Sequence, residues 1–313
     1  MVPPKKSIDR QAWSATKVVA SIATLAISVL FLLVVITLAI NVFSTSFSQE
    51  IKSGNVAVIS VKGVIASGQS FVEGSVDSEE IKDFLKQASE DSSIKAIILD
   101  INSPGGTPVA SEEIATAVKK TNKTTIALIR DVGASGAYWV ASATNQIWAS
   151  KLSVTGSIGV IGSYLEFAKL AQDWNVTYRR LVGGAYKDVG DPLSELTPEK
   201  ERLLQEEIDL LHTYFIEAIA QNRNLSLERV QELADGRTYL GAQAQELGLI
   251  DQLGNMDDAI ATLEKQLGTS VEPVFYEHKF TLFDILGRLS TQAMHAMGKG
   301  IGAGLVSRHQ FMT

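Results

Sequence analysis

Residues 125–143 have the sequence TIALIRDVGASGAYWVASA, which predicts a strand, a tight turn and a helix in direct succession. The strand covers 125–130, where β-branched and other apolar residues predominate. The turn Gly133-Ala134-Ser135-Gly136 consists of small residues, and a helix is expected over 136–143. Such a turn exposes a side-chain hydroxyl at the carboxyl edge of a sheet, beside the partial positive charge at the N-terminus of the helix.

The segments on both sides of this stretch continue the alternation of strands with helices. Further strands are predicted at 56–61, 94–100 and 146–149, and helices at 78–88, 107–121, 198–222 and 226–234. Two short helices are expected after the stretch 235–241. Strands that alternate with helices favour an α/β fold with a mainly parallel sheet covered by helices.

The composition argues against several classes of partner and site. The chain has 313 residues, enough for one large or two modest domains, and its net charge of −7 gives no basic surface for nucleic acid. It has no cysteine, which excludes disulfides and thiolate metal ligands. The sequence also lacks an HExxH motif, an EF-hand loop and a Walker-type phosphate loop. No cofactor, no metal and no nucleic acid are therefore expected.

The N-terminal region predicts a membrane span. No charged residue occurs from Val18 to Phe43. As a helix with a rise of ~1.5 Å per residue, this stretch would be about 37 Å long, which is enough to cross a hydrocarbon layer of about 30 Å. A cleaved signal peptide is the alternative, but its apolar region would cover only ~7–15 residues and an A-x-A site would follow it. Four basic residues precede the span and predict a cytoplasmic N-terminus with an outward-facing remainder: Lys5, Lys6, Arg10 and Lys17.

These features divide the chain into five segments. Residues 1–17 form the cytoplasmic N-terminus, 18–43 the transmembrane anchor and 44–54 a polar, serine-rich tether. Residues 55–275 form the main domain. Residues 276–313 form an apolar tail broken by glycines, for which docking on the main domain, contact with a membrane surface and disorder are the alternatives.

Ser135 and Lys187 are the candidate catalytic pair, 52 positions apart. A serine activated by a lysine amine is a known variant of the catalytic triad, and this chain offers no cysteine and has its four histidines only after the glycine-rich region. The amine must be neutral to accept a proton, which requires burial, and Asp188 is expected to point away because its charge would oppose this. The alternatives are that Ser135 is an ordinary helix N-cap and that Lys187 is a solvated surface charge.

Two further loops combine glycines with hydroxyls. Asn102-Ser103-Pro104-Gly105-Gly106 follows a predicted strand, and its consecutive glycines can direct backbone N–H groups into a cleft, as an oxyanion hole requires. Ser157, in the loop 154–160, could hydrogen-bond the lysine amine and orient it. The alternatives are an ordinary glycine-rich loop and an ordinary turn serine. Two glycine loops at strand ends of one sheet favour the functional interpretation, because parallel sheets place their sites along that edge.

Five segments in this order resemble the membrane-anchored signal peptide peptidases of the SppA type: NSPGG (102–106), GASGAYWVAS (133–142), VTGSIGV (154–160), GAYKD (184–188) and GRTYLGAQAQELGLIDQLG (236–254). Members of this family are serine peptidases with a Clp-protease/crotonase-like fold. The resemblance implies Ser135 as the nucleophile, Lys187 as the general base and Ser157 as a partner of the lysine.

The resemblance also implies where the oxyanion donors lie. It assigns them to the backbone of Gly105 or Gly106 and to the backbone of Gly136. Ala137 is a departure from the pattern, since family members often carry a second glycine after the serine. A methyl group at this position is expected to be tolerated.

The expected function is that of a single-pass, outward-facing Ser/Lys endopeptidase. Its substrates would be short, unfolded, largely apolar peptides, including signal peptides left in the membrane after export. Longer members of the family contain two copies of the domain, so the resemblance implies that a single-copy chain forms a homo-oligomeric ring with sites shared between subunits. The alternatives are a crotonase-like acyl-CoA enzyme, which shares the fold and the oxyanion hole, and a catalytically silent membrane scaffold that binds peptides.

Overall fold

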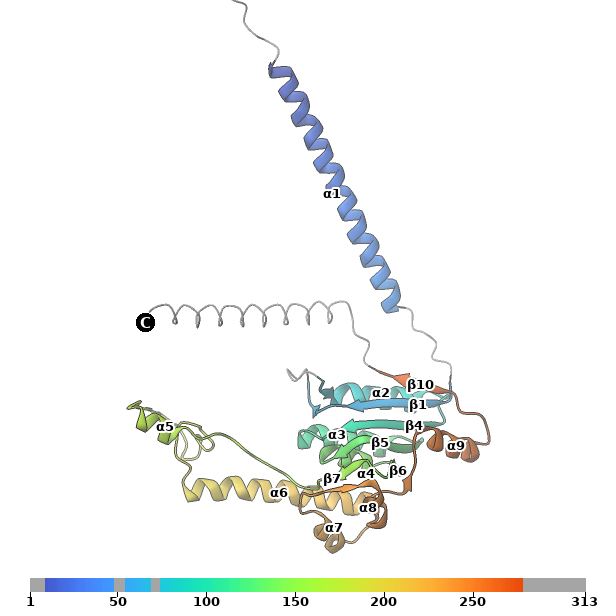
Figure 1. The fold of residues 1–313 in the computed structure, drawn as a ribbon, viewed down its shortest axis with the longest axis vertical. Coiled ribbons are helices and arrows are strands. Elements are labelled where there is room, and N and C mark those ends of the chain that lie inside the picture. Colours follow the sequence, from blue (N-terminus) through green and yellow to red (C-terminus); the bar gives the residue numbers. More distant parts are fainter. Residues whose placement is uncertain (1–8, 48–53, 69–73, 278–313) are drawn as a thin grey trace, which may run out of the picture. The chain divides into compact units, whose positions relative to one another are not determined.

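The computed structural model describes residues 9–47, 54–68 and 74–277 (Figure 1). The chain divides into two compact units, one of which is the body, Ser53–His278. The other contains the N-terminal helix. The predicted apolar stretch that begins at Phe280 lies outside the described residues.

The N-terminal helix α1 covers Asp9–Phe47. Its apolar stretch Lys17–Ala39 has 23 residues with a mean hydropathy of 2.9, and none of it is buried. The hydroxyls of Thr24 and Ser28 donate to the carbonyl groups four residues earlier, at 2.8 and 2.9 Å, so they add no unpaired polar group to the stretch. The described part of the chain therefore contains one helix long and apolar enough to cross a membrane, and this helix continues to Phe47, inside the predicted tether.

The core of the body is an eight-stranded, mostly parallel sheet. Six strands form its main path in the order β10-β1-β4-β5-β6-β9, and β7 pairs with the end of β5 and with β8. All of these pairs are parallel except β7 with β8. The strands are β1 (Val56–Lys62), β4 (Ala96–Ser103), β5 (Thr124–Ala134), β6 (Gln146–Ala149), β7 (Val154–Gly156), β8 (Thr238–Leu240), β9 (Gln252–Leu253) and β10 (Pro273–Tyr276).

Helices cover both faces of this sheet. Alternate residues of β4 enter separate hydrophobic clusters, with Ile97 and Leu99 on the face of α2, α3 and α4, and Ile98 on the face of α9. A strand buried on both faces has a continuous apolar run, which explains the sequence of β4. The helices of the body are α2 (Ser78–Glu90), α3 (Pro108–Lys120), α4 (Gly136–Ser142), α5 (Ala168–Asp173), α6 (Pro198–Arg223), α7 (Leu227–Leu233), α8 (Gly241–Glu246) and α9 (Met256–Leu267).

Most predicted elements are present, with differences at the ends of the sheet. The stretch 154–160 was expected to be a loop, but its first three residues form β7 because they pair with the extension of β5 to Ala134. The short strands β9 and β10 and the helix α5 were not predicted. The strand β10 pairs with β1 at the edge of the sheet and ends at Tyr276, one residue beyond the predicted domain boundary at 275.

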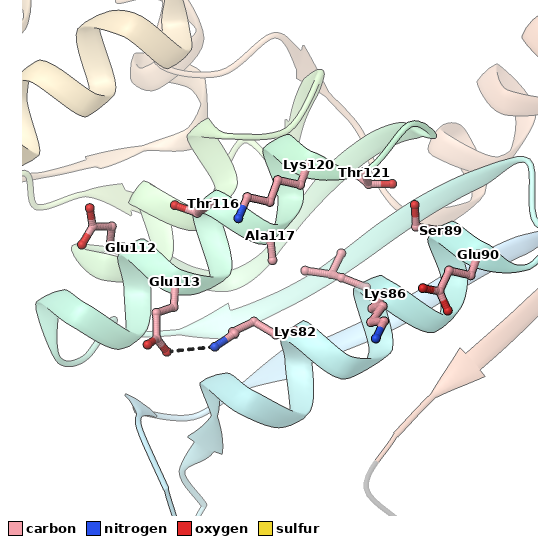
Figure 2. A pocket seen from close by; sticks show the side chains of 11 residues that line it. Lys82, Lys86, Ser89, Glu90, Glu112, Glu113, Thr116, Ala117, Lys120 and Thr121 are labelled. Carbon is pink, nitrogen blue, oxygen red and sulfur yellow. Dashed lines mark ion pairs between the residues drawn. The ribbon is translucent and has the colours of Figure 1, made fainter.

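A cavity of about 480 Å³ lies between α2 and α3 (Figure 2). Leu85 and Ala117 are its apolar lining residues, and the remaining lining residues are polar or charged, with Lys82 paired to Glu113 at 3.5 Å. None of the predicted site residues lines it.

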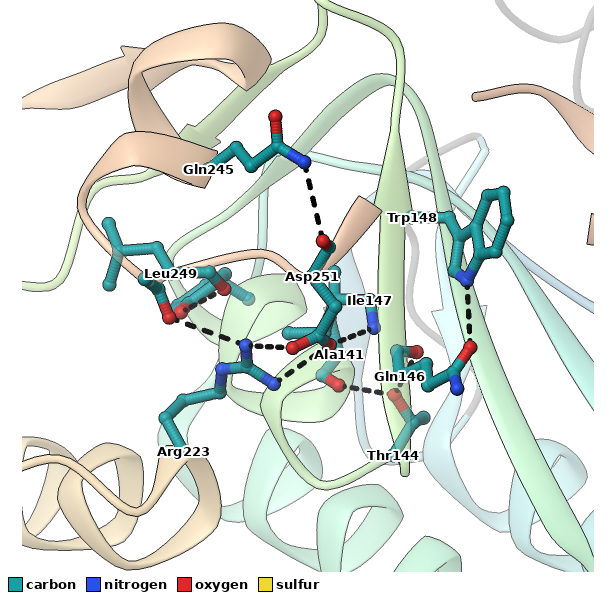
Figure 3. A network of polar contacts seen from close by, with 11 residues as sticks. Ala141, Thr144, Gln146, Ile147, Trp148, Arg223, Gln245, Leu249 and Asp251 are labelled. Carbon is teal, nitrogen blue, oxygen red and sulfur yellow. Dashed lines mark hydrogen bonds and ion pairs between the residues drawn. The ribbon is translucent and has the colours of Figure 1, made fainter. Parts of the chain in front are cut away.

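A polar network fixes the C-terminal end of α6 to the body (Figure 3). The guanidinium of Arg223 contacts both carboxylate oxygens of Asp251, at 2.7 and 3.1 Å, and Asp251 also accepts a hydrogen bond from the N–H of Ile147 at 2.7 Å. Tyr138 of α4 donates to the carbonyl oxygen of Leu249 at 2.7 Å. Burial raises the pKa of Tyr138, so its hydroxyl keeps the proton that it donates. The network joins α4, α6 and the segment that leads to β9.

The segment 161–197, here called the arm, extends from the body together with the N-terminal half of α6 (Figure 1). Ala168 and Asp188 are its only buried residues. The C-terminal half of α6 packs on the body through Phe215, Ile216 and Ile219. The arm therefore lacks a hydrophobic core of its own in a single chain.

Candidate active site

The carboxyl ends of three parallel strands bring the predicted loops together. Ser103 of β4 lies opposite Gly133 of β5, and Ala134 of β5 lies opposite Gly156 of β7. The pairing extends one residue further, because the N–H of Ser135 donates to the carbonyl of Gly156 at 2.8 Å. The turns that follow these strands therefore meet at one edge of the sheet, as the sequence predicts.

Ser135 has a strained backbone. Its φ is 55° and its ψ is −127°, and Ser157 also has a positive φ of 51°. Two other non-glycine residues with positive φ occur among the described residues, and both are asparagines, which tolerate this conformation: Asn175 and Asn224. Such strain costs about 1–3 kcal/mol and is concentrated at functional sites. The two predicted serines are thus the described residues with the least ordinary backbone.

Ser135 is not an ordinary N-cap. It occupies the N-cap position of α4, but its side chain makes no capping hydrogen bond. Within the described residues its hydroxyl has no other hydrogen bond. The strained backbone therefore does not serve helix capping, and the hydroxyl is free to react.

Three glycines surround Ser135 so closely that no side chain would fit. A Cβ on Gly105 would lie 2.7 Å from the nitrogen of Gly136 and 2.9 Å from the Cβ of Ser135. A Cβ on Gly106 would lie 1.8 Å from the carbonyl oxygen of Ile65, and one on Gly136 would lie 2.2 Å from the hydroxyl of Ser111. The loop after β4 and the turn after β5 are therefore in direct contact.

The backbone donors at this site are not equivalent. The N–H of Gly105 donates to the hydroxyl of Ser103 at 3.1 Å, so it is already satisfied. Within the described residues, the N–H groups of Gly106 and Gly136 donate to no protein acceptor. The nitrogen of Gly106 would also lie only 3.3 Å from a Cβ on Gly136, so the two free donors are neighbours.

A short strand holds the glycine loop in place. In β2 (Ile65–Ala66), the N–H of Ile65 donates to the carbonyl of Gly105 at 2.9 Å, and its own carbonyl accepts from the N–H of Thr107 at 2.9 Å. Ser103 is fully buried and fixes the loop from the other side. No role was predicted for Ser103, although a serine two residues before a glycine is typical of a side-chain to backbone turn.

Ser157 lies beside Ser135, and Lys187 does not. The pairing of β5 with β7 places Ser157 next to the Ser135 turn, where its N–H donates to the carbonyl of Arg237 at 2.8 Å. Lys187 lies in the arm, in an exposed turn that its N–H closes by donating to the carbonyl of Gly184 at 3.3 Å. Its ammonium makes no hydrogen bond or ion pair in the part of the chain that the structure describes.

The length of α6 separates the two predicted catalytic residues. Asp188, the neighbour of Lys187, is bound to Lys200 near the start of α6. Trp139 of α4 stacks on Phe215 of α6 with the ring centroids 5.0 Å apart, one turn from Ser135. The 15 residues between Lys200 and Phe215 span about 22 Å of helix. One chain therefore brings together Ser135, Ser157 and the free glycine donors, but not Lys187.

The carboxylate of Asp188 was expected to point away from Lys187, and it is bound to other cations. Asp188 is 7% exposed, and its carboxylate is bound by Lys200 at 2.8 Å and by Arg180. Its charge is therefore directed to these two cations. Among the described residues, no group of three or more His, Cys, Asp or Glu side chains is placed to hold a metal ion.

The arrangement at the sheet edge is suited to acyl transfer. A free hydroxyl next to two free backbone donors can attack a carbonyl carbon while the donors stabilise the oxyanion that forms. A proton acceptor is the component that the single chain does not bring to this edge. The edge therefore brings together a free hydroxyl and two free backbone donors, but no base.

Comparison with known proteins supports the interpretation drawn from the motifs. Residues 117–270 match Peptidase family S49, a range that includes Ser135, Ser157 and Lys187. The chain is 36% identical over 214 residues to a protein of Enterococcus faecium named putative signal peptide peptidase SppA; the match covers 66% of this chain but only 62% of that protein. It is 38% identical over 223 residues to a putative protease of Synechocystis, covering 69% of this chain and 74% of that protein.

A solved structure of ClpP1 from Listeria monocytogenes aligns with 64% of this chain and 92% of its own, at 14% identity and a TM-score of 0.43. The observed sheet, parallel in all pairs but one and covered by helices, has the predicted α/β architecture. The resemblance inferred from the five motifs is thus confirmed by the family match and the relatives.

Proposed function

This chain belongs to peptidase family S49, and from that premise we propose that it is a membrane-anchored endopeptidase with a Ser135/Lys187 dyad. It is a serine-type peptidase by family, and the finer assignments are inferences from the geometry. The observation that carries them is the strained, uncapped Ser135 beside the free N–H groups of Gly106 and Gly136.

In the proposed reaction Ser135 is the nucleophile. Its Oγ attacks the scissile carbonyl carbon as Lys187 Nζ takes the hydroxyl proton, and the N–H groups of Gly106 and Gly136 stabilise the oxyanion. The C–N bond then breaks, the leaving amine receives the proton from the lysine, and an acyl-enzyme remains. The lysine next takes a proton from water, which attacks the ester carbonyl and releases the acid product and Ser135. Ser157 orients the amine throughout.

The lysine comes from a neighbouring copy of the chain in this proposal. Within one chain, Lys187 is exposed and separated from Ser135 by most of the length of α6. A base must also lose its water to be neutral, and the exposed arm offers no burial by itself. A head-to-tail ring of identical subunits would supply both the missing base and the missing burial.

The surface of the arm supports such an assembly. Large apolar side chains are exposed along it to an extent that a monomer rarely shows in one segment. Four of the most exposed are Ile161 (88%), Leu165 (72%), Trp174 (77%) and Leu181 (101%). Packing against another copy would remove them from water, and the same contact would carry Lys187 to the Ser135 of that copy.

Short, unfolded, largely apolar peptides are the proposed substrates, with signal peptides left in the membrane after export among them. The apolar helix α1 would hold the enzyme at the membrane where such peptides remain. The basic residues Lys5, Lys6 and Arg10 favour a cytoplasmic N-terminus, so the body would lie on the outer side. Protease added to intact spheroplasts should then digest the body or release it from the membrane. Full protection until lysis would contradict this orientation.

A fluorophosphonate probe tests the proposed chemistry directly. The probe should modify Ser135 in the wild type, slowly in Lys187→Ala, and not at all in Ser135→Ala. In the control variant Ser92→Ala, which removes an exposed hydroxyl after α2, Ser135 should take up the label as in the wild type. Modification at Ser135 would exclude both a crotonase-like enzyme and a silent scaffold. A wild-type chain that is folded and assembled but takes up no probe would overturn the proposal.

A further inference from the structure

Lys187 is flanked by two residues that are both bound to the first turn of α6, and we propose that they position it for catalysis. Tyr186 and Asp188 are the positioning residues, and Glu199 and Lys200 are their partners on the helix. The inference rests on the proposed role of Lys187 as the base, and it assigns to the start of α6 the task of holding that base.

The two contacts form a clamp on either side of the lysine. The hydroxyl of Tyr186 donates to Glu199 Oε1 at 2.7 Å, and Lys200 Nζ contacts Asp188 Oδ2 at 2.8 Å. The hydrogen bond to Glu199 raises the pKa of Tyr186, so the hydroxyl keeps its proton. Since the residues before and after Lys187 are bound to consecutive helical residues, the backbone of Lys187 cannot turn without breaking one contact.

The burial of Asp188 indicates that its side of the clamp is a built site. Its side chain is 4% exposed in an arm where almost every other residue is exposed. Lys200 is also largely buried, with 14% of its side chain exposed, and Arg180 reaches the same carboxylate from another part of the arm. Burying a carboxylate is costly unless cations accompany it, so this cluster marks a fixed point in an otherwise open segment.

Through α6, the clamp connects the Lys187 turn rigidly to the body. At its C-terminal end, α6 is fixed by Arg223 to Asp251 (Figure 3). Asn222 also donates to the hydroxyl of Ser142 at 2.9 Å. A continuous helix of 26 residues is a stiff connection of about 39 Å. Lys187 is therefore held at a defined distance from its own body, which is the requirement for reaching a site on a neighbouring copy.

The cations of the clamp have a second effect on the base. An unpaired carboxylate next to Lys187 would favour the ammonium form, which cannot accept a proton. The groups that face Asp188 are Arg180 from the arm and Lys200 from α6, and together they neutralise its charge. Asp188 can thus lie next to Lys187 in the sequence without favouring the protonated form of the lysine.

The test compares two tyrosines that make the same bond in the same arm. Tyr186→Phe removes the hydroxyl bound to Glu199, whereas the control Tyr178→Phe removes a hydroxyl that donates to Asp191 at 2.6 Å and has no link to α6. Asp188→Asn tests the other side of the clamp. Lys200→Arg is the conservative variant, which should preserve the ion pair with Asp188. We expect Tyr186→Phe and Asp188→Asn to lower kcat by about 10- to 100-fold with little change in KM, as a displacement of the lysine amine by about 1 Å would. Tyr178→Phe and Lys200→Arg should keep the wild-type kcat.

A second measurement separates positioning from a general structural effect. In a Lys187→Ala background the clamp variants should not slow the labelling of Ser135 by fluorophosphonate any further, because they act through the lysine. Wild-type kcat in Tyr186→Phe would overturn the clamp, as would equal losses in Tyr178→Phe or a further loss in the Lys187→Ala background. Tyr186→Phe alone decides the question if Asp188→Asn fails to fold. An active Lys187→Ala chain would instead refute the dyad itself, which is a distinct outcome.

Discussion

The carboxyl edge of the sheet and the arm carry the two halves of the proposed dyad, and they are built in opposite ways. At the edge, Gly105 and Gly136 are in van der Waals contact and Ser135 is held in a strained conformation by the strands around it. In the arm, Lys187 lies in an exposed turn, and apolar side chains such as Trp174 face solvent. The edge is fully packed within one chain, whereas the arm exposes apolar surface that only contact with another surface would bury.

This difference separates what one chain can prepare from what an assembly must supply. Strain at Ser135 requires a rigid surrounding, which the buried sheet provides. Burial of the lysine amine requires a second surface, which the open arm lacks. We infer that the nucleophile and the oxyanion donors are preformed in each subunit and that the base arrives with the neighbouring subunit.

Loss of either residue of the proposed dyad should give the largest effect. Ser135→Ala and Lys187→Ala should each lower kcat/KM by about 10⁴-fold or more, and the double variant should be little worse, because the two groups act as a unit. The unfolding temperature should stay that of the wild type. Peptidase assays on the three purified variants check this, and near-normal turnover in Lys187→Ala would rule out the dyad.

Charges placed on the arm should separate assembly from folding. Trp174→Glu and Leu181→Glu put carboxylates on side chains that are 77% and 101% exposed in one chain, so the subunit should still fold. The proposed oligomer should dissociate, with at least a tenfold loss of activity and without loss of the strained Ser135 turn. Sedimentation velocity and peptide hydrolysis measure the two effects.

Leu152→Glu is the matched control for the arm, since this leucine is 69% exposed on the body between β6 and β7. It should leave the sedimentation coefficient unchanged. Equal dissociation by the body and arm variants would mean that the arm has no special role in assembly.

Weakening the attachment of α6 to the body should lower the free energy of unfolding moderately. Asp251→Asn removes the ion pair with Arg223 but keeps an oxygen for the N–H of Ile147. Since a third of the Asp251 side chain is exposed, we expect a loss of about 2 kcal/mol, below the ~3–5 kcal/mol of fully buried pairs. Urea denaturation measures it. Glu232→Gln breaks the exposed pair with Arg229 and should leave the free energy of unfolding unchanged.

A pair of glycine substitutions compares the packing of the two regions. Gly106→Ala places a Cβ 1.8 Å from the carbonyl of Ile65 and should cost about 1–3 kcal/mol, as overpacking does. Gly183→Ala, in the arm, has no neighbouring atom within 4 Å and should leave the unfolding temperature of the dissociated subunit unchanged. Equal destabilisation by the two substitutions would contradict the difference in packing.

The edge of the sheet was predictable from the sequence because its signals are local. The apolar run of β5, the small-residue turn at Ser135 and the glycines at 105 and 106 each specify their own conformation over a few residues. The parallel order of the strands then brings these turns together. The short strands β9 and β10 were missed because two to four residues carry no period, and only pairing with β6 and β1 defines them.

The arm was less predictable for a physical reason. Its sequence has no amphipathic period that would place one face on the body, and α5 is only six residues long. The contacts that define it join residues separated in the chain, such as Glu166 with Leu196, or belong to another copy in the proposed assembly. The expectation that Asp188 avoids Lys187 followed from charge alone, but its cationic partners could not be named without the fold.

Subunit complementation tests the shared site most directly. Inactive Ser135→Ala and Lys187→Ala chains are mixed in equal amounts, dissociated and reassembled, and the peptidase activity is compared with that of the wild type treated in the same way. If each site takes its serine from one subunit and its lysine from the next, about a quarter of the interfaces in a random ring are complete, and activity should return to about that fraction. A mixture that co-assembles but stays inactive would show that both residues of each site belong to one chain, and it would contradict the division between edge and arm.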